Sequence, residues 1–255
     1  MNTVTVKNVV IGAGIPKICI PIVATAKEDI IKEAKNLLMF PVDIVEWRVD
    51  WFEHVEDFEQ VIDVLKELNR VLTSIPLLFT FRTIKEGGVK EFETKAYIDL
   101  LKSIIDTQLI DFIDVEIFTG DNIVQEIINK AHENGVKVIA SNHDFKKTPP
   151  KEEIVSRLLK MQEIGADIAK IAVMPNSKMD VLVLLEATLE MSEKHADRPI
   201  ITMSMADLGV ISRLSGQVFG SSVTFASAQK ASAPGQIPAK QLEEVLHILN
   251  QGMKE

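Results

Sequence analysis

The sequence predicts a (β/α)8 TIM barrel, an α/β fold in which eight parallel strands alternate with helices around one core. Short β-rich runs alternate with charge-bearing helical segments eight times over 255 residues, about 30 residues per repeat. No Pro-, Gly- or Ser-rich linker interrupts the pattern, so residues 1–255 are expected to form a single domain. A doubly wound sheet uses the same units, but Gly12 and Gly14 precede the first strand and lack the third glycine of its phosphate-binding turn.

The strands are expected where short runs are rich in Val, Ile and aromatic residues. The predicted strands are residues 18–24, 43–50, 77–83, 112–117, 136–143, 168–174, 199–205 and 223–227. Ahead of them, we interpret residues 4–15 as a two-stranded β-hairpin that closes the floor of the barrel.

The segments between strands carry Leu, Ile and Val at spacings of three and four residues, which is typical of amphipathic helices. The predicted helices are residues 27–39, 57–72, 94–106, 122–133, 151–164, 178–194, 208–214 and 239–250. Residues that favour helix ends agree with these bounds: Thr25 and Pro150 at two starts, and Gly135 and Gly165 at two ends.

The composition fits a soluble globular protein, with 46% hydrophobic and 25% charged residues. A net charge of -9 makes nucleic acid and anionic membrane poor candidates for partners. No apolar run approaches the roughly 18 residues that a membrane helix needs, and no signal peptide is recognisable. The single cysteine, Cys19, cannot form an internal disulfide, which favours a cytoplasmic location.

Charged residues alternate with apolar ones along three of the predicted strands. Glu46 and Arg48 alternate with apolar residues in one strand, Arg82 lies on the same side as Leu78 and Thr80 in the next, and Asp114 and Glu116 alternate with apolar residues in the one after. Because one face of a barrel strand meets the helices, the charged set is expected to point inward, toward the end where loops and water meet. The pattern predicts a polar binding chamber; the alternative is that these charges form structural ion pairs.

Arginine placement indicates what this chamber binds. The chain has six arginines, at positions 48, 70, 82, 157, 198 and 213. Arg48, Arg82 and Arg213 belong to strand ends or the loops that follow, where the active sites of such barrels lie. Guanidinium groups suit a carboxylate and hydroxyls, so we expect a small, anionic, oxygen-rich substrate.

Lys170 is a lone lysine within an apolar strand. It shares a side with Ile168 and Ala172, and the small Ala172 leaves room beside its stem. Burial disfavours the ammonium form, so we expect the amine to be neutral often enough to attack a ketone and form a Schiff base. The alternative is a structural lysine paired with Asp114 or Glu116.

His143 ends the fifth predicted strand, at the top of the barrel and beside the strand of Lys170. An imidazole there can move a proton near neutral pH, and Glu86, in the loop after the third strand, could orient it. The other histidines are interpreted as surface residues. No His, Cys or carboxylate spacing suggests a metal site, and we expect no cofactor.

The segment 227–238, after the last barrel strand, is small, polar and rich in Ser, Ala and Pro. We interpret it as a lid that carries Ser232 and Gln236 as hydrogen-bonding groups. The alternative is a plain connection.

Several short motifs, taken together and in order, resemble the type I 3-dehydroquinate dehydratases, the Schiff-base class of the shikimate pathway. The likeness spans residues 17–237 and includes 46–48 (EWR), 81–83 (FRT), 86–88 (EGG), 141–145 (SNHDF), 170–175 (KIAVMP), 202–205 (TMSM), 212–214 (SRL) and 232–236 (SAPGQ). Pro21 departs from the family, whose members often carry a serine there.

The resemblance implies a (β/α)8 barrel, usually a homodimer, that removes water from 3-dehydroquinate in aromatic amino acid biosynthesis, with no metal or other cofactor. It implies that Lys170 forms the imine, that His143 is the general acid and base, and that Glu86 holds His143. It further implies substrate-binding roles for Glu46, Arg48, Arg82, Met203, Met205, Arg213, Phe225, Ser232 and Gln236.

Two other functions stay open at this point. A class I aldolase also uses a lysine imine in a barrel, but many aldolases bind phosphate through glycine-rich loops that residues 207–209 and 227–238 do not resemble. A non-catalytic barrel that binds a polar ligand would give no reason for a lysine inside the chamber.

Overall fold

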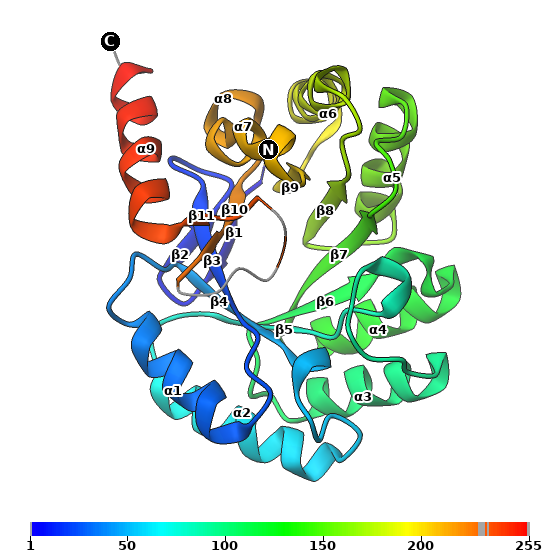
Figure 1. The fold of residues 1–255 in the computed structure, drawn as a ribbon. Helices are drawn as coiled ribbons and strands as arrows, with labels where there is room; N and C mark the ends of the chain where they lie inside the picture. Colours follow the sequence, from blue (N-terminus) through cyan, green and yellow to red (C-terminus); the bar gives the residue numbers. More distant parts are fainter. Residues whose placement is uncertain (1, 229–232, 234, 254–255) are drawn as a thin grey trace.

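A curled parallel sheet forms the centre of the computed structural model, which describes residues 2–228, 233 and 235–253. In that part of the chain the barrel strands are β3 (Lys17–Ile22), β4 (Ile44–Arg48), β5 (Leu77–Thr80), β6 (Phe112–Glu116), β7 (Lys137–Asp144), β8 (Ile168–Val173), β9 (Ile200–Ser204) and β10 (Val223–Ser227). Each of β3 to β8 pairs in parallel with the next strand in chain order, and β10 pairs in parallel with β3 (Figure 1). The short β11 (Ile237–Pro238) adds to β10.

The barrel closes where β9 meets the segment that leads into β10. Ile200 and Ser221 form a parallel bridge, and the Ser222 amide donates to the Ile200 carbonyl at 2.8 Å. The predicted (β/α)8 fold is therefore confirmed.

The predicted floor hairpin is also present. β1 (Val4–Val6) pairs antiparallel with β2 (Val9–Ile11). Val4 and Ile11 are buried against the first inward-facing residues of the barrel strands, including Ile44, Leu78 and Ile168. Because these residues stand at the amino ends of the strands, the hairpin seals the end opposite to the one where the strands deliver their charged residues.

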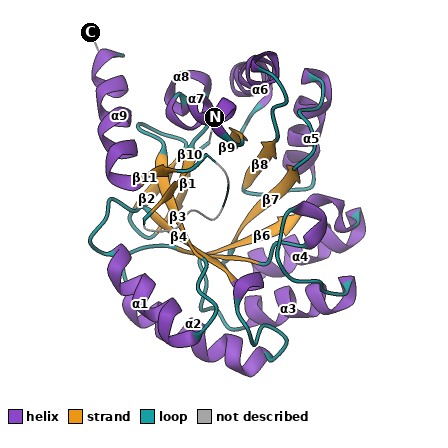
Figure 2. Ribbon diagram, in the orientation of Figure 1, coloured by secondary structure: helices purple, strands orange, loops and turns teal. Residues whose placement is uncertain are grey.

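The helices form an outer ring around the sheet (Figure 2). They are α1 (Lys27–Leu37), α2 (Phe58–Val71), α3 (Thr94–Asp106), α4 (Asp121–Glu133), α5 (Lys151–Glu163), α6 (Lys178–Glu190), α7 (Val210–Leu214), α8 (Gly216–Phe219) and α9 (Ala239–Gly252). None of the helices in the described residues combines the length and the apolar character that crossing a membrane requires.

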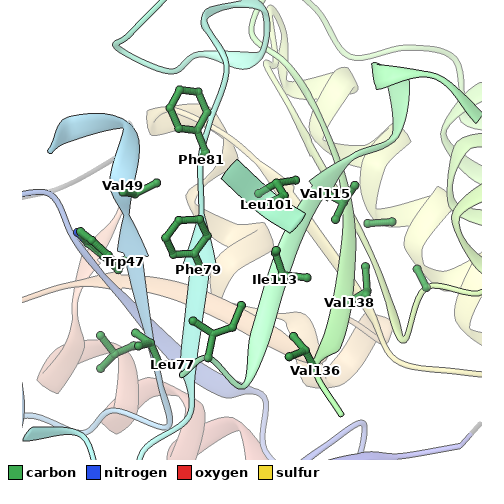
Figure 3. Close-up of a cluster of buried hydrophobic side chains, with 14 of the residues drawn as sticks. Trp47, Val49, Leu77, Phe79, Phe81, Leu101, Ile113, Val115, Val136 and Val138 are labelled. Carbon is green, nitrogen blue, oxygen red and sulfur yellow. The ribbon is translucent and has the colours of Figure 1, made fainter. Parts of the chain in front are cut away.

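The core lies between helices and sheet, as the alternation along the strands predicts. Outward side chains of β4 to β7, among them Trp47, Phe79, Ile113 and Val138, are fully buried beneath the ring (Figure 3). Trp47 packs edge-on against Phe79, with ring centroids 5.7 Å apart. Burial of such side chains stabilises the fold by about 1.5–3 kcal/mol each. Because this apolar core lies outside the sheet, the inward face of the strands can carry polar residues.

Several predicted boundaries are wrong. β4 ends at Arg48 because residues 49–51 form a 3-10 turn, which lets the Asp50 carboxylate accept hydrogen bonds from the Arg48 side chain. In the segment predicted as one helix over 178–194, the α-helix ends at Glu190 and a short π-helix follows over Met191–His195. Thr25 does not cap α1, whose N-cap residue is Ala26. Gly135 and Gly165 do end helices, both in the left-handed conformation that glycine favours.

Candidate active site

A cavity of about 210 Å³ opens at the carboxyl ends of the strands. Its lining includes eleven of the predicted site residues: Glu46, Arg48, Arg82, Glu86, His143, Lys170, Met203, Met205, Arg213, Phe225 and Gln236. Ser232 lies outside the described residues. Sequence reasoning missed Gly87, Phe145 and Ala233 as lining residues, although all three stand in the motifs that carried the family resemblance.

Lys170 lies in the middle of β8 with only 3% of its surface exposed. Its Nζ is 3.1 Å from Asp114 Oδ2 and 3.9 Å from Glu46 Oε1, and 4.6 Å from the centroid of the Phe225 ring. The ion pair with Asp114, considered above as an alternative, is therefore present. It does not remove the lysine from the chamber, because Lys170 and its neighbour Ala172 both line the cavity.

Asp114 links the lysine to the arginine of the neighbouring strand. It accepts hydrogen bonds from Ser141 Oγ at 2.6 Å and from Lys170, and it forms an ion pair with Arg82 at 2.8 Å. Burial alone would raise the pKa of this carboxyl, but the positive charges of Arg82 and Lys170 outweigh burial and hold it at about 2. Asp114 is therefore a fixed negative charge beneath the cavity.

His143, on the strand next to that of Lys170, forms a pair with Glu86. Glu86 Oε2 accepts from the His143 backbone amide at 2.9 Å and lies 3.0 Å from its Nδ1. Burial, followed by the positive charges of Arg82, Lys170 and Arg48, lowers the pKa of His143 well below its ordinary value. The imidazole is thus neutral at neutral pH, as a base must be.

The pKa of Glu86 is displaced in the other direction. Burial raises it to about 8, the charge of Glu116 adds to the effect, and the charge of Arg82 opposes it. The positions of Glu86 and His143 agree with the prediction that the carboxyl orients the histidine.

The three predicted arginines differ in their partners. Arg48 forms a two-pronged bond with Asp50, both contacts at 2.7 Å. Arg82 forms ion pairs with Asp114 and Glu116. Arg48 and Arg82 therefore do form structural ion pairs, and both also line the cavity. Arg213 points its Nη1 toward the Phe225 carbonyl at 3.5 Å, and burial lowers its pKa to about 10. It stays positively charged at neutral pH.

Pro21 is not among the residues that line the cavity. It pairs in register with Glu46 and lines a separate groove with residues such as Leu37 and Phe40. Among the described residues, no three His, Cys, Asp or Glu side chains gather closely enough to hold a metal ion. A reaction without a cofactor stays a prediction.

The sequence matches the family model of type I 3-dehydroquinase over residues 18–253. The chain belongs to the type I 3-dehydroquinase family. It is 58% identical to the type I 3-dehydroquinate dehydratase of Clostridium difficile, whose crystal structure with covalently modified comenic acid superimposes with a TM-score of 0.96 over 98% of this chain and 99% of that one.

Two further relatives agree with this family. The 3-dehydroquinate dehydratase of Salmonella typhimurium is 53% identical over 98% of this chain and all of that protein. The structure of the Enterococcus faecalis enzyme is 44% identical, with a TM-score of 0.91 over 96% of this chain and 98% of that one. Family membership favours the dehydratase over the class I aldolase and the non-catalytic barrel.

Proposed function

We infer that this chain is a hydro-lyase that converts 3-dehydroquinate to 3-dehydroshikimate in the shikimate pathway. The observation that carries this inference is the placement of Lys170, the His143–Glu86 pair and Arg213 around one cavity. Relatives of full length at 53% and 58% identity bear the name of this activity. The substrate is a small molecule with one ketone, one carboxylate and several hydroxyls, which matches the oxygen-rich anion expected from the arginines.

The reaction begins at Lys170. As the amine attacks the ketone carbon, the proton that its ammonium form gives up goes to the ketone oxygen, and the resulting carbinolamine loses water to give a protonated imine. Asp114, at 3.1 Å, stays negative and balances the positive charge that the nitrogen carries in the imine. The imine withdraws electrons from the adjacent carbon, so its C–H bond becomes acidic enough for a histidine to break.

His143 then moves the proton. Its Nε2 takes a proton from the carbon next to the imine, which leaves an enamine. The enamine electrons expel the neighbouring hydroxyl, to which His143 returns the proton so that it leaves as water. Hydrolysis of the imine by a second water molecule releases the enone and restores the amine of Lys170. Glu86 holds His143 in place during both transfers.

The remaining cavity residues bind and enclose the substrate. Arg213 binds the carboxylate, and Glu46, Arg48 and Arg82 meet the hydroxyls. Met203, Met205 and Phe225 form apolar walls. Gln236 contributes a polar group from the segment that follows β10, and we assign the same task to Ser232.

Trapping of the imine tests this proposal. Borohydride added with 3-dehydroquinate should reduce the imine to a stable secondary amine at Lys170, detected by intact mass and peptide mapping. A Lys170→Met variant should give no adduct, whereas Lys137→Met, at a lysine paired with Asp167, should behave as the wild type. An adduct elsewhere, or none, would overturn the assignment.

His143→Ala separates the two chemical stages. The variant should still form the imine, because that step uses the amine of Lys170, but should lose most turnover. Full activity in an absorbance assay for the enone product would remove His143 from the mechanism.

We also propose that the protein is a cytoplasmic homodimer whose residues 1–255 act as a single domain. Exposed apolar side chains on the neighbouring helices α6, α7 and α8 support a contact between copies there: Met179, Leu182, Ile211 and Val218. Leu182→Glu should shift the mass in solution from dimer to monomer by light scattering. Met39→Glu, at an exposed residue after α1, should not.

A further inference from the structure

We propose that Asn142 and Arg157 are positioning residues that hold Glu86, and through it His143, in the arrangement that leaves His143 Nε2 free to accept a proton. This inference rests on the function proposed above and adds two side chains that do not line the cavity. Asn142 is 4% exposed and lies on the helix-facing side of β7, one residue before His143. Arg157 comes from α5.

A continuous line of hydrogen bonds joins α5 to the cavity. Arg157 Nη1 donates to Asn142 Oδ1 at 2.7 Å, and Asn142 Nδ2 donates to Glu86 Oε1 at 3.1 Å. The other oxygen of Glu86 receives the His143 backbone amide and faces Nδ1. Each carboxylate oxygen therefore has its own partner, and the plane of the carboxylate is fixed from two sides.

Arg157 determines how the side-chain amide of Asn142 is oriented. A guanidinium group donates but cannot accept, so the asparagine must turn its oxygen toward Arg157 and its NH2 toward Glu86. Without Arg157 the amide is free to rotate and present its oxygen to the carboxylate, a repulsive contact. Arg157 is itself held in place, because its other Nη pairs with Glu153 and its guanidinium lies 5.5 Å from the centroid of the Phe118 ring.

The ionisation of Glu86 decides which nitrogen of His143 carries the proton. A carboxylate only accepts, so it requires Nδ1–H and leaves the lone pair on Nε2. A protonated Glu86 can instead donate to Nδ1, which moves the imidazole proton to Nε2 and removes the base. Because hydrogen bonds donated to a carboxylate favour its charged form, Asn142 selects the active tautomer.

Glu86 is sensitive to this control because its raised pKa of about 8 lies close to neutral pH, where a modest shift changes how much of the carboxyl is ionised. The charged groups that face the Glu86–His143 pair from the surrounding elements are Arg48 on β4, Arg82 after β5, Asp114 and Glu116 on β6, and Lys170 on β8. None of these groups is removed by a change at Asn142 or Arg157, so we expect a shift in the titration of Glu86 to report the hydrogen-bonded line itself.

The test is the pH profile of kcat from pH 6 to 10. Wild-type kcat should rise with pH as Glu86 ionises. Asn142→Leu and Arg157→Met should each lower kcat at pH 7 by roughly 10- to 100-fold with KM within about twofold, and move the rising limb upward by about one pH unit. Arg157→Lys, which keeps a donor, should recover part of the loss.

Two variants serve as controls. Glu153→Gln removes the charge of the other partner of Arg157 but keeps an oxygen that accepts a hydrogen bond from it, so the profile should be unchanged. In a Glu86→Gln background no carboxyl titrates at this position, so Arg157→Met should cause no further shift. If Asn142→Leu fails to fold, Arg157→Met decides alone, because its side chain lies at the edge of α5 and is 17% exposed.

A second measurement needs no substrate. Diethyl pyrocarbonate modifies unprotonated imidazole nitrogens, and its rate at His143, followed by peptide mass, should show the same shifted pH dependence in Asn142→Leu and Arg157→Met. An active wild type whose variants keep its pH profile and its His143 modification rate would overturn this proposal. A wild type without dehydratase activity would overturn the proposed function instead, while the modification rates would still test the line.

Discussion

Lys170 Nζ lies 3.1 Å from Asp114 Oδ2, and both side chains are buried at the centre of the barrel. The same carboxylate oxygen is 2.8 Å from Arg82, so one anion serves two cations. Removal of one cation would leave the other pair intact, whereas removal of Asp114 leaves two buried positive charges side by side. The stability of this centre therefore depends more on the carboxylate than on either partner.

We expect Asp114→Asn to lower the free energy of unfolding at pH 7 by about 3–5 kcal/mol, because a buried charge that loses its partner is strongly destabilising. Imine formation should also slow, since the asparagine no longer balances the charge of the imine nitrogen. Urea unfolding and borohydride trapping measure the two effects. Asp63→Asn, at an exposed aspartate of α2 paired with Lys27, is the matched control and should leave both unchanged.

The stability difference between wild type and Asp114→Asn should depend on pH. The pKa of Asp114 is lowered from 3.8 to about 2 in the folded state. Its ionisation therefore contributes about 2 kcal/mol that is present above pH 3.8 and is lost as the pH falls through 2. The difference between the urea midpoints of the two proteins should therefore narrow between pH 4 and pH 2. Parallel curves over this range would contradict the linkage.

Gly87 and Phe145 set the position of the loop that carries Glu86. Gly87 has φ 86°, and a Cβ atom added there would lie 2.2 Å from Phe145 Cε2. We expect Gly87→Ala to lower kcat/KM by about 10²-fold, because the displaced loop moves Glu86 away from His143. Steady-state kinetics of the dehydration measure the effect.

A second substitution separates the clash from backbone strain. Phe145→Ala removes the ring that the new methyl group meets, so the Gly87→Ala/Phe145→Ala double variant should regain much of the lost kcat/KM relative to Phe145→Ala alone. The left-handed backbone still costs about 1–2 kcal/mol in that variant. A double variant as impaired as Gly87→Ala would show that the clash with Phe145 is not the cause.

The fold and most of the cavity were predictable because strand residues obey a period of two. Glu46, Arg48 and Lys170 point inward for this reason alone, and the pattern holds whatever the loops do. The contributions of Gly87, Phe145 and Ala233 depend on loop conformations that no periodicity encodes. Asn142 also follows from the period of two as an outward residue, but its bond to Arg157 requires the position of α5 relative to β7, which only the folded chain supplies.

Arg213 is expected to bind the substrate carboxylate, so Arg213→Gln should raise KM roughly 10²-fold, the loss of a charge-assisted bond of about 3 kcal/mol. Arg213→Lys should recover only part, because an ammonium cannot bind a carboxylate through two parallel bonds. Arg198→Gln, at an arginine held by Asp197 and the Ala166 carbonyl, is the control and should keep the wild-type KM.

The pH dependence of KM gives an independent check on Arg213. Burial lowers its pKa to about 10, so the guanidinium stays charged up to about pH 9 and loses charge as the pH approaches and passes 10. KM should accordingly be flat to about pH 9 and then rise. In Arg213→Gln, which has no charge to lose, this rise should be absent; a rise of equal size in the variant would assign it to another group.

Ionisation of Glu86 should lower the free energy of unfolding of the protein. Its pKa is raised from 4.5 to about 8 in the folded state, so the stability that protonated Glu86 provides is fully present below pH 4.5 and is lost as the pH rises through 8. The loss amounts to at most about 5 kcal/mol. Glu86→Gln cannot ionise and should lose much less stability between pH 5 and pH 9, as measured by urea midpoints, while its kcat falls.

The control for this comparison is Glu126→Gln, at a largely exposed glutamate of α4 paired with Lys102, whose unfolding should follow the wild type at every pH. If Glu86→Gln and wild type lose equal stability toward pH 9, the carboxyl is not held in its neutral form by the fold. A buried acid that costs stability when it ionises, and activity when it does not, is a position where a gain in one property is a loss in the other.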